Sequence, residues 1–161
     1  GFTSGGLATC RFVTGRFPER KPRPIVANLK MPRSDSIVDD ISAGGLAAPI
    51  DMHNGTLGPA VTAFPESVGD RIHTHPDTGA SITGTSLPFW SDIIDLTIST
   101  HKKMPNAPFV GWDVTVTKGG GAMIIEPNDG WGASTSEKPG GIPLSDTQYQ
   151  NMYDRWMESL I

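Results

Sequence analysis

The clearest pattern along the chain is a series of short segments in which hydrophobic and polar positions alternate. Such alternation is typical of β-strands that bury one face and leave the other polar. Glycine and proline, 19 and 14 of the 161 residues, separate these segments throughout and indicate many short turns. The dipeptide Asn54-Gly55 is a strong hairpin signal and predicts a turn at 51–55. We predict strands over 7–14, 24–29, 47–50, 56–64, 109–117 and 122–126.

Two other segments have the helical period. The first begins after Pro88, where a missing N–H costs least, and ends before Pro105 with His101, Lys102 and Lys103. The second is predicted to begin at Ser145 as its N-cap. The apolar stripes of the two helices are Trp90, Ile93, Ile94, Leu96 and Ile98, and Tyr149, Met152, Tyr153 and Trp156.

The order of these elements predicts the fold class. Strands come first, followed by a helix, a hairpin and a last helix, with a loop of little hydrophobic content over 128–141. This order predicts an α+β fold with a mostly antiparallel sheet and flanking helices.

Composition changes this picture only by exclusion. No apolar run approaches the roughly 18 residues of a membrane span, so no membrane partner is expected. The net charge is −4 and no basic stripe is present, so no nucleic-acid partner is expected. The single Cys10 lies in an apolar segment and is interpreted as a buried structural thiol. A chain without a disulfide framework fits a cytoplasmic location, and the sequence does not indicate an oligomeric state.

The first residue is Gly1, within a turn-like segment that runs directly into a strand. We therefore expect residues 1–161 to be part of a longer protein, with the missing part upstream.

Candidate chemistry concentrates on the predicted hairpin of 109–126. Asp113 lies on the face opposite the valines of its strand, and Glu126 and Asn128 are two positions apart, so they face the same way. A turn at Gly119-Gly120 would place Asp113 opposite Glu126. Oxygen ligands of this kind suit Mg²⁺, which uses one or two carboxylates together with substrate phosphates. Spacing alone leaves a second interpretation open, a solvated hairpin edge whose acidic residues keep it soluble.

The same residues carry a resemblance to a known family. The stretches Gly111-Trp112-Asp113-Val114 and Ile124-Ile125-Glu126-Pro127-Asn128 resemble the metal-binding hairpin of ATP-grasp enzymes. More closely, the chain resembles the sugar-transfer-associated ATP-grasp group, related to α-L-glutamate-ligase-like proteins. The further motifs that agree in order are Thr9-Cys10-Arg11-Phe12-Val13-Thr14, Val38-Asp39-Asp40 leading to Gly44-Gly45, Ala48-Pro49-Ile50-Asp51, and His75-Pro76-Asp77-Thr78-Gly79.

The resemblance implies the C-terminal portion of an ATP-grasp domain, with ATP and Mg²⁺ as cofactors. Asp113, Glu126 and Asn128 would hold Mg²⁺ on the nucleotide phosphates, and Arg11 would face the phosphates or an acyl-phosphate as a catalytic residue. Arginine suits that role through its forked donors, whereas a surface or sheet-edge ion pair is the structural alternative. The implied reaction is a ligation of a small-molecule carboxylate with an amine or similar nucleophile.

The resemblance also implies residues near the second substrate. Gly44 and Gly45 resemble a loop beside the acceptor, although an ordinary turn explains them equally well. His75 resembles a residue that positions a loop over the substrate.

Two departures from the family pattern leave alternatives open. Pro127 replaces the expected glycine between the metal residues, and Asp40 stands where the family tends to have asparagine. Both features favour a non-catalytic ATP-grasp-like binding module. A zinc-dependent hydrolase built around His73 and His75 is a further alternative.

Overall fold

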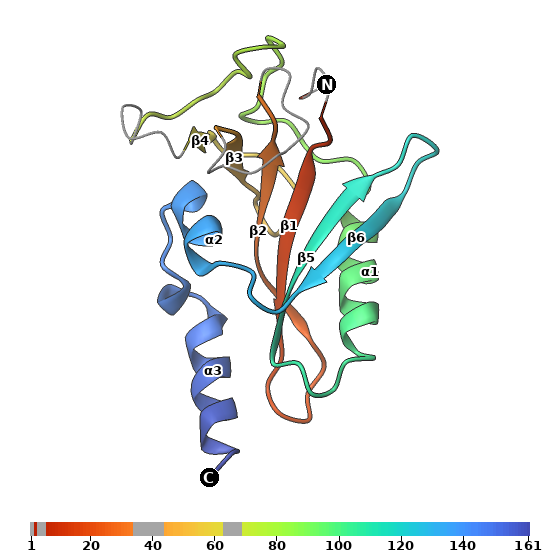
Figure 1. Ribbon diagram of the computed structural model, residues 1–161, viewed down its shortest axis with the longest axis vertical. Coiled ribbons are helices and arrows are strands. Elements are labelled where there is room, and N and C mark those ends of the chain that lie inside the picture. Colours follow the sequence, from red (N-terminus) through yellow and green to blue (C-terminus); the bar gives the residue numbers. More distant parts are fainter. Residues whose placement is uncertain (1, 3–5, 34–43, 63–68) are drawn as a thin grey trace.

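The chain forms one six-stranded antiparallel sheet with helices on both faces (Figure 1). The computed structural model describes residues 2, 6–33, 44–62 and 69–161. The strand order is β4-β3-β2-β1-β5-β6. The predicted α+β class is therefore confirmed. The elements are β1 (Thr9–Gly15), β2 (Arg23–Met31), β3 (Leu46–Pro49), β4 (Val61–Thr62), α1 (Trp90–His101), β5 (Phe109–Val116), β6 (Ala122–Asn128), α2 (Ala133–Gly140), the 3-10 helix η3 (Leu144–Asp146) and α3 (Gln148–Glu158).

The main core lies between the sheet and α1. Alternate residues of β1 and β5, among them Phe12 and Trp112, point to this side and are at most 3% exposed. Trp90 of α1 packs on Phe12 with ring centroids 5.5 Å apart. Each such side chain, when fully buried, contributes about 1.5–3 kcal/mol. This core packs against β1 and β5, which are neighbours in the sheet.

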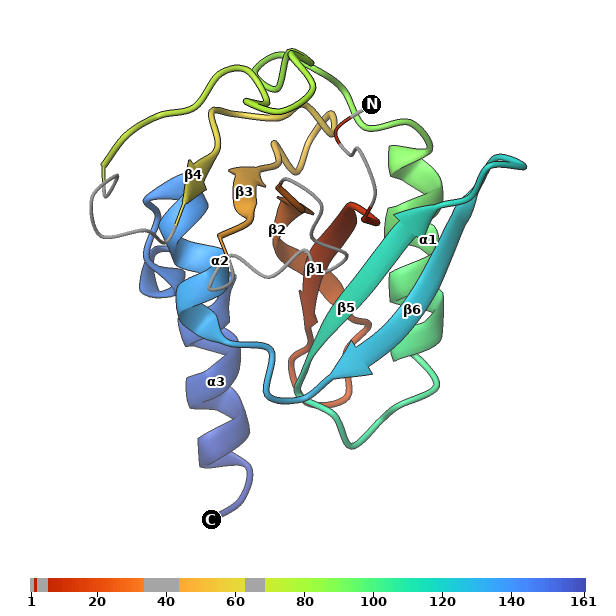
Figure 2. The same ribbon diagram turned by 45° about the horizontal axis from the view of Figure 1, so that its top comes forward.

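The second face of the sheet carries α2 and α3, as the turned view shows (Figure 2). Val13, Trp131 and Leu144 form a smaller buried cluster there, joined by Phe109 and Tyr149. Met152 of α3 is fully buried. A Cβ at Gly15 would lie only 2.9 Å from the Met152 sulfur, so glycine is what allows this close approach.

Three sequence predictions are corrected here. The turn at Asn54-Gly55 exists, but isolated bridges such as Ile50–Leu57 replace the start of the predicted strand 56–64, and within its described part, 56–62, only β4 is a strand. The predicted loop 128–141 contains α2, a helix that the polar sequence of this segment did not predict. The last helix begins two residues late, because Thr147 and not Ser145 accepts the capping hydrogen bond from Tyr149 N–H.

The part of the chain that the structure describes contains no helix that is both long and apolar enough to cross a membrane.

Candidate functional site

Charged side chains form a row across three neighbouring strands. Arg11 on β1 is the register partner of Asp113 on β5, and Asp113 is in turn the register partner of Glu126 on β6. Asn128 lies two pairs further along, opposite Gly111. The predicted hairpin geometry is therefore confirmed, since Asp113 does lie opposite Glu126. The pairing register of β5 and β6 shifts between Asp113 and Val114, and this irregularity determines which residues pair on either side of it.

Asp113 and Arg11 form the centre of the row. The Arg11 Nε atom lies 2.7 Å from Asp113 Oδ1, and the Nη2 atom lies 3.1 Å from Oδ2. The pair is therefore bidentate, and both side chains are largely buried, 14% and 9% exposed. Buried bidentate pairs are held in one geometry because leaving either charge alone is costly. Arg11 does form an ion pair, as the structural alternative predicted, but on a central strand and in a largely buried position.

A third hydrogen bond fixes the guanidinium from the other side. Arg11 Nη1–H donates to the main-chain carbonyl of Trp131 over 2.8 Å. Three of the five guanidinium N–H groups are therefore engaged by Asp113 and Trp131. The remaining two N–H groups can donate to an anionic ligand.

Lys30 also belongs to the charged row, although the sequence alone did not identify it. Its Nζ lies 3.4 Å from Asp113 Oδ2, and the residue is 7% exposed. Asn28, the register partner of Arg11 on β2, is fully buried on the same face. In the sequence, Asn28 and Lys30 alternate with three apolar residues of β2. This alternation could have identified both residues, because polar side chains on a buried strand need polar partners on their face of the sheet.

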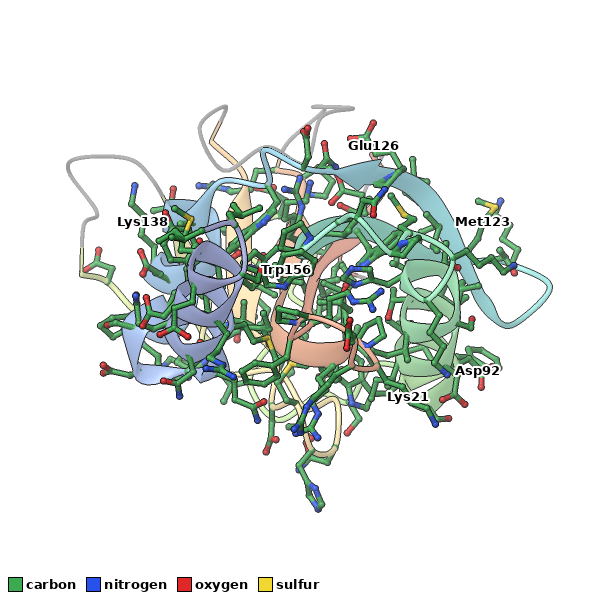
Figure 3. All side chains as sticks on the ribbon, turned by 90° about the horizontal axis from the view of Figure 1, so that it is seen from below. Lys21, Asp92, Met123, Glu126, Lys138 and Trp156 are labelled. Atoms are coloured by element: carbon green, nitrogen blue, oxygen red, sulfur yellow. The ribbon has the colours of Figure 1, made fainter. Side chains whose placement is uncertain are left out.

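Glu126 and Asn128 form the open end of the row. Glu126 is exposed, and Asn128 Nδ2–H donates to its Oε1 atom over 3.2 Å, so the Asn128 amide oxygen is not used in this bond. Figure 3 shows Glu126 at the outer edge of the sheet, away from Asp92 and α1. The donor set of two carboxylates and one amide consists of oxygen atoms and fits Mg²⁺.

The residues that the structure describes contain no group of three or more His, Cys, Asp or Glu side chains placed to hold a metal ion. A cation at the row would thus have two carboxylates and would need phosphate or water oxygens to complete its shell. Arg11 and Lys30 already balance the charges of Asp113 and Glu126. A bound Mg²⁺ would therefore make the site positive and suited to a polyphosphate.

Pro127 does not interrupt the strand that carries these ligands. It pairs with Trp112 in the register, and β6 runs through it to Asn128. Because β6 is the last strand of the described sheet, one side of it pairs with no described strand, and a residue without N–H is tolerated there. The departure from the family pattern therefore leaves the two flanking side chains on one face. Asp40, the second departure, lies outside the described residues.

Cys10 lies on the opposite face of β1 from Arg11. The residue is 3% exposed, and burial raises the pKa of its thiol far above the ordinary value, with the nearby Asp113 charge adding to the effect. The predicted structural thiol is therefore confirmed as buried, and its protonated form is favoured.

The other predicted site residues are placed elsewhere. Gly44 and Gly45 are buried just before β3, with Gly44 at a φ of 94°. His75 is 1% exposed, its Nε2–H donates to Pro32 O over 3.1 Å, and its Nδ1 accepts from Asp77 N–H over 3.3 Å. It therefore holds its own loop to the end of β2.

His73 is exposed and bonds to Thr83 over 3.0 Å. With both ring nitrogens of His75 engaged by its own loop and by Pro32, these two histidines do not favour the zinc alternative.

A broad depression lies away from the charged row. It has a volume of about 870 Å³ and is lined by Phe17, Pro18, Arg20, Asn151, Asp154, Arg155, Glu158 and Ser159. These residues belong to the turn between β1 and β2 and to α3. The candidate chemistry is therefore identified by the charged row and not by this depression.

Comparison with known proteins gives one family match. The family model described as sugar-transfer associated ATP-grasp matches residues 1–148. No curated protein and no solved structure matches the chain. The match covers every residue of the charged row and stops at the first residue of α3.

Proposed function

Because the chain belongs to the sugar-transfer-associated ATP-grasp family, we propose that it takes part in an ATP-dependent ligation of a carboxylate with an amine or a similar nucleophile. Family membership by itself supports the coarser statement that this is an ATP-grasp domain with an ATP-binding role. The observation that carries the finer proposal is the row Arg11–Asp113–Glu126. It joins carboxylate oxygens and guanidinium donors on adjacent strands.

In the proposed reaction a carboxylate oxygen attacks the γ-phosphorus of ATP, and ADP leaves. The acyl-phosphate then reacts at its carbonyl carbon with the amine, and inorganic phosphate leaves with the electron pair of the broken C–O bond. Asp113, Glu126 and Asn128 would hold Mg²⁺, which supplies charge neutralisation on the transferred phosphoryl group. The chain's own part is positioning and electrostatic stabilisation.

Arg11 supports this proposal through its geometry. Asp113 and the Trp131 carbonyl fix the guanidinium before any ligand arrives, so little reorganisation is needed when charge develops. Its two remaining N–H groups suit phosphate oxygens. Lys30, which also contacts Asp113, adds a second positive charge to the same face.

A non-catalytic binding module remains the second candidate function. Pro127 was one of its two supports, and β6 runs through this residue as a continuous strand that keeps Glu126 and Asn128 on one face. A module and an enzyme differ in turnover, so release of ADP separates them.

The test is Mg²⁺-dependent release of ADP from ATP in the presence of candidate carboxylates and amines. We expect Asp113→Asn and Glu126→Gln each to lower the rate on the order of 100-fold, because each removes a charge at the phosphoryl-transfer centre. Asp92→Asn is the matched control, since Asp92 is an exposed carboxylate on α1 (Figure 3). Equal rates in wild type, Asp113→Asn and Glu126→Gln would contradict the metal assignment, and ATP binding without turnover would support the module.

A further inference from the structure

Tyr149 lies at the start of α3, one residue beyond the family match, and it touches the segment that holds Arg11. Its ring meets the Trp131 ring edge-on with centroids 5.9 Å apart, and it packs on Phe109 with centroids 4.5 Å apart. Phe109 is on β5, the strand of Asp113. Tyr149 therefore connects α3 with both the strand and the loop of the charged row.

The main-chain carbonyl of Trp131 needs such an anchor. Trp131 stands between Gly130 and Gly132, and Gly132 has a φ of 67°. Glycines on both sides give the backbone more freedom than other residues would. The position of the carbonyl is consequently set by the Trp131 side chain, which is 7% exposed.

The Trp131 ring is held from two sides. On the sheet side it lies over Gly111, where an added Cβ would come within 2.2 Å of the Trp131 Cβ. On the other side it meets Tyr149, whose position is fixed by the Thr147 cap at 3.1 Å. One turn further along α3, buried Met152 lies against Gly15.

From these contacts we infer that Tyr149 is a positioning residue, which acts through Trp131 to hold the Arg11 guanidinium in the orientation needed for a phosphate ligand. The Trp131 carbonyl takes the Nη1 donor while Asp113 takes Nε and Nη2. Loss of the Tyr149 ring frees the loop, and Arg11 then keeps only its bonds to Asp113. The positioning itself is a property of the fold, whereas its use for phosphate binding rests on the proposed function.

The decisive measurement is the hydrogen-exchange rate of the Arg11 side-chain Nη1–H that donates to Trp131, followed by NMR in protein labelled with ¹⁵N-arginine. In Tyr149→Leu we expect this exchange to accelerate about tenfold, the effect of losing roughly one hydrogen bond to a charged group. Tyr149→Phe keeps the ring and should restore the wild-type rate. Tyr153→Leu is the matched control, because Tyr153 is an exposed tyrosine one turn along α3 that stacks on Tyr149 at 6.1 Å.

An unchanged Arg11 rate in Tyr149→Leu, or the same acceleration in Tyr153→Leu, would overturn the inference. Backbone-amide exchange of Met152 shows whether α3 itself has unfolded; if it has, Trp131→Leu tests the same link from the loop side and must accelerate Arg11 exchange. The readout needs no turnover. A protein that releases no ADP but shows the Tyr149 effect would therefore reject the proposed ligation and keep the positioning role, and the reverse result would reject only the positioning role.

Discussion

At the scale of single residues, Gly111 shows that the charged row depends on close packing between the sheet and Trp131. The residue faces Trp131 and lies next to Arg11, whose Cδ would be 3.6 Å from an added Cβ. Replacement by alanine leaves no room at the Trp131 Cβ, so the Trp131 loop has to move. We expect Gly111→Ala to lower the free energy of unfolding by about 1–3 kcal/mol, the usual cost of overpacking. Urea unfolding followed by tryptophan fluorescence measures this loss.

The control for this prediction is Gly119→Ala in the hairpin turn. No atom lies within 4 Å of a Cβ built at Gly119, and its φ is outside the left-handed region. The free energy of unfolding should therefore change by less than about 0.5 kcal/mol. Equal losses in the two variants would mean that packing against Trp131 is not the cause.

The sequence identified Asp113, Glu126 and Arg11 singly but not the bond that joins two of them. Arg11 and Asp113 are 102 residues apart, and their pairing depends on the register of β1 against β5. Local alternation sets which face a side chain takes, whereas register depends on how the whole sheet assembles. For the same reason the sequence could not place Trp131 over Gly111.

At the scale of secondary-structure elements, a buried hydrogen-bond chain joins α1 to the sheet. Trp112 Nε1–H donates to Thr14 Oγ1 over 2.8 Å, and Thr14 Oγ1 lies 2.7 Å from His101 Nδ1. His101 Nε2 lies 2.9 Å from Ala107 O and donates to it. The chain is satisfied when His101 is neutral, with its proton on Nε2 and its Nδ1 accepting from the Thr14 hydroxyl. It connects the last turn of α1 with β1 and β5.

Removing the hydroxyl from this chain tests its contribution to stability. Thr14→Val keeps the shape but leaves Trp112 Nε1–H and His101 Nδ1 without the partner they have in the structure. We expect a loss of about 1–3 kcal/mol in the free energy of unfolding. Thr100→Val on the same helix is a control, because its half-buried hydroxyl bonds only to the carbonyl of Leu96 among the described residues. A loss in Thr14→Val no larger than in Thr100→Val would contradict this role.

The same chain predicts how stability depends on pH. Burial lowers the pKa of His101 below its ordinary value of 6.5, and the positive charge of Arg16 adds to this effect, while the bond to Ala107 opposes it. The unfolded chain therefore takes up a proton at His101 more readily than the folded chain does. Stability from this residue is fully present above about pH 6.5 and falls as the pH drops below that value.

Urea unfolding at pH 7.5 and at pH 5.5 measures this dependence. Wild type should lose stability at the lower pH, and His101→Gln should lose less, because glutamine does not titrate. An equal loss in both proteins would assign the pH dependence to other groups.

The elements themselves were predicted where periodicity was strong and missed where it was weak. The alternating strands β1, β2 and β5 and the apolar stripe of α1 appear close to their predicted bounds. The α2 segment Ala133–Gly140 contains Pro139 and glycine, and its stability comes from tertiary contacts and not from its own composition. The Thr147 cap was missed because both Ser145 and Thr147 are good capping residues, and η3 occupies the first of them.

At the scale of the whole molecule, the sheet separates two environments. Its α1 side is closed by apolar packing, and its second face carries charges on β2, β1, β5 and β6. The chain has a net charge of −4, whereas the charges of Arg11 and Lys30 balance those of Asp113 and Glu126, so this row is less negative than the chain as a whole. A nucleotide polyphosphate approaching this face is attracted by these two groups and repelled by the rest of the protein.

Lys30 makes this charge balance testable, because its removal should move two affinities in opposite directions. Lys30→Met keeps the apolar stem and deletes a positive charge 3.4 Å from Asp113. Mg²⁺ alone should then bind more tightly, since the row becomes more negative, while ATP in saturating Mg²⁺ should bind more weakly, each by about tenfold. Calorimetric titrations measure both constants, and Lys118→Met in the exposed hairpin turn is the charge-matched control. If both affinities fall together, Lys30 supports the fold of the row; if neither changes, the charged face is not where the nucleotide binds.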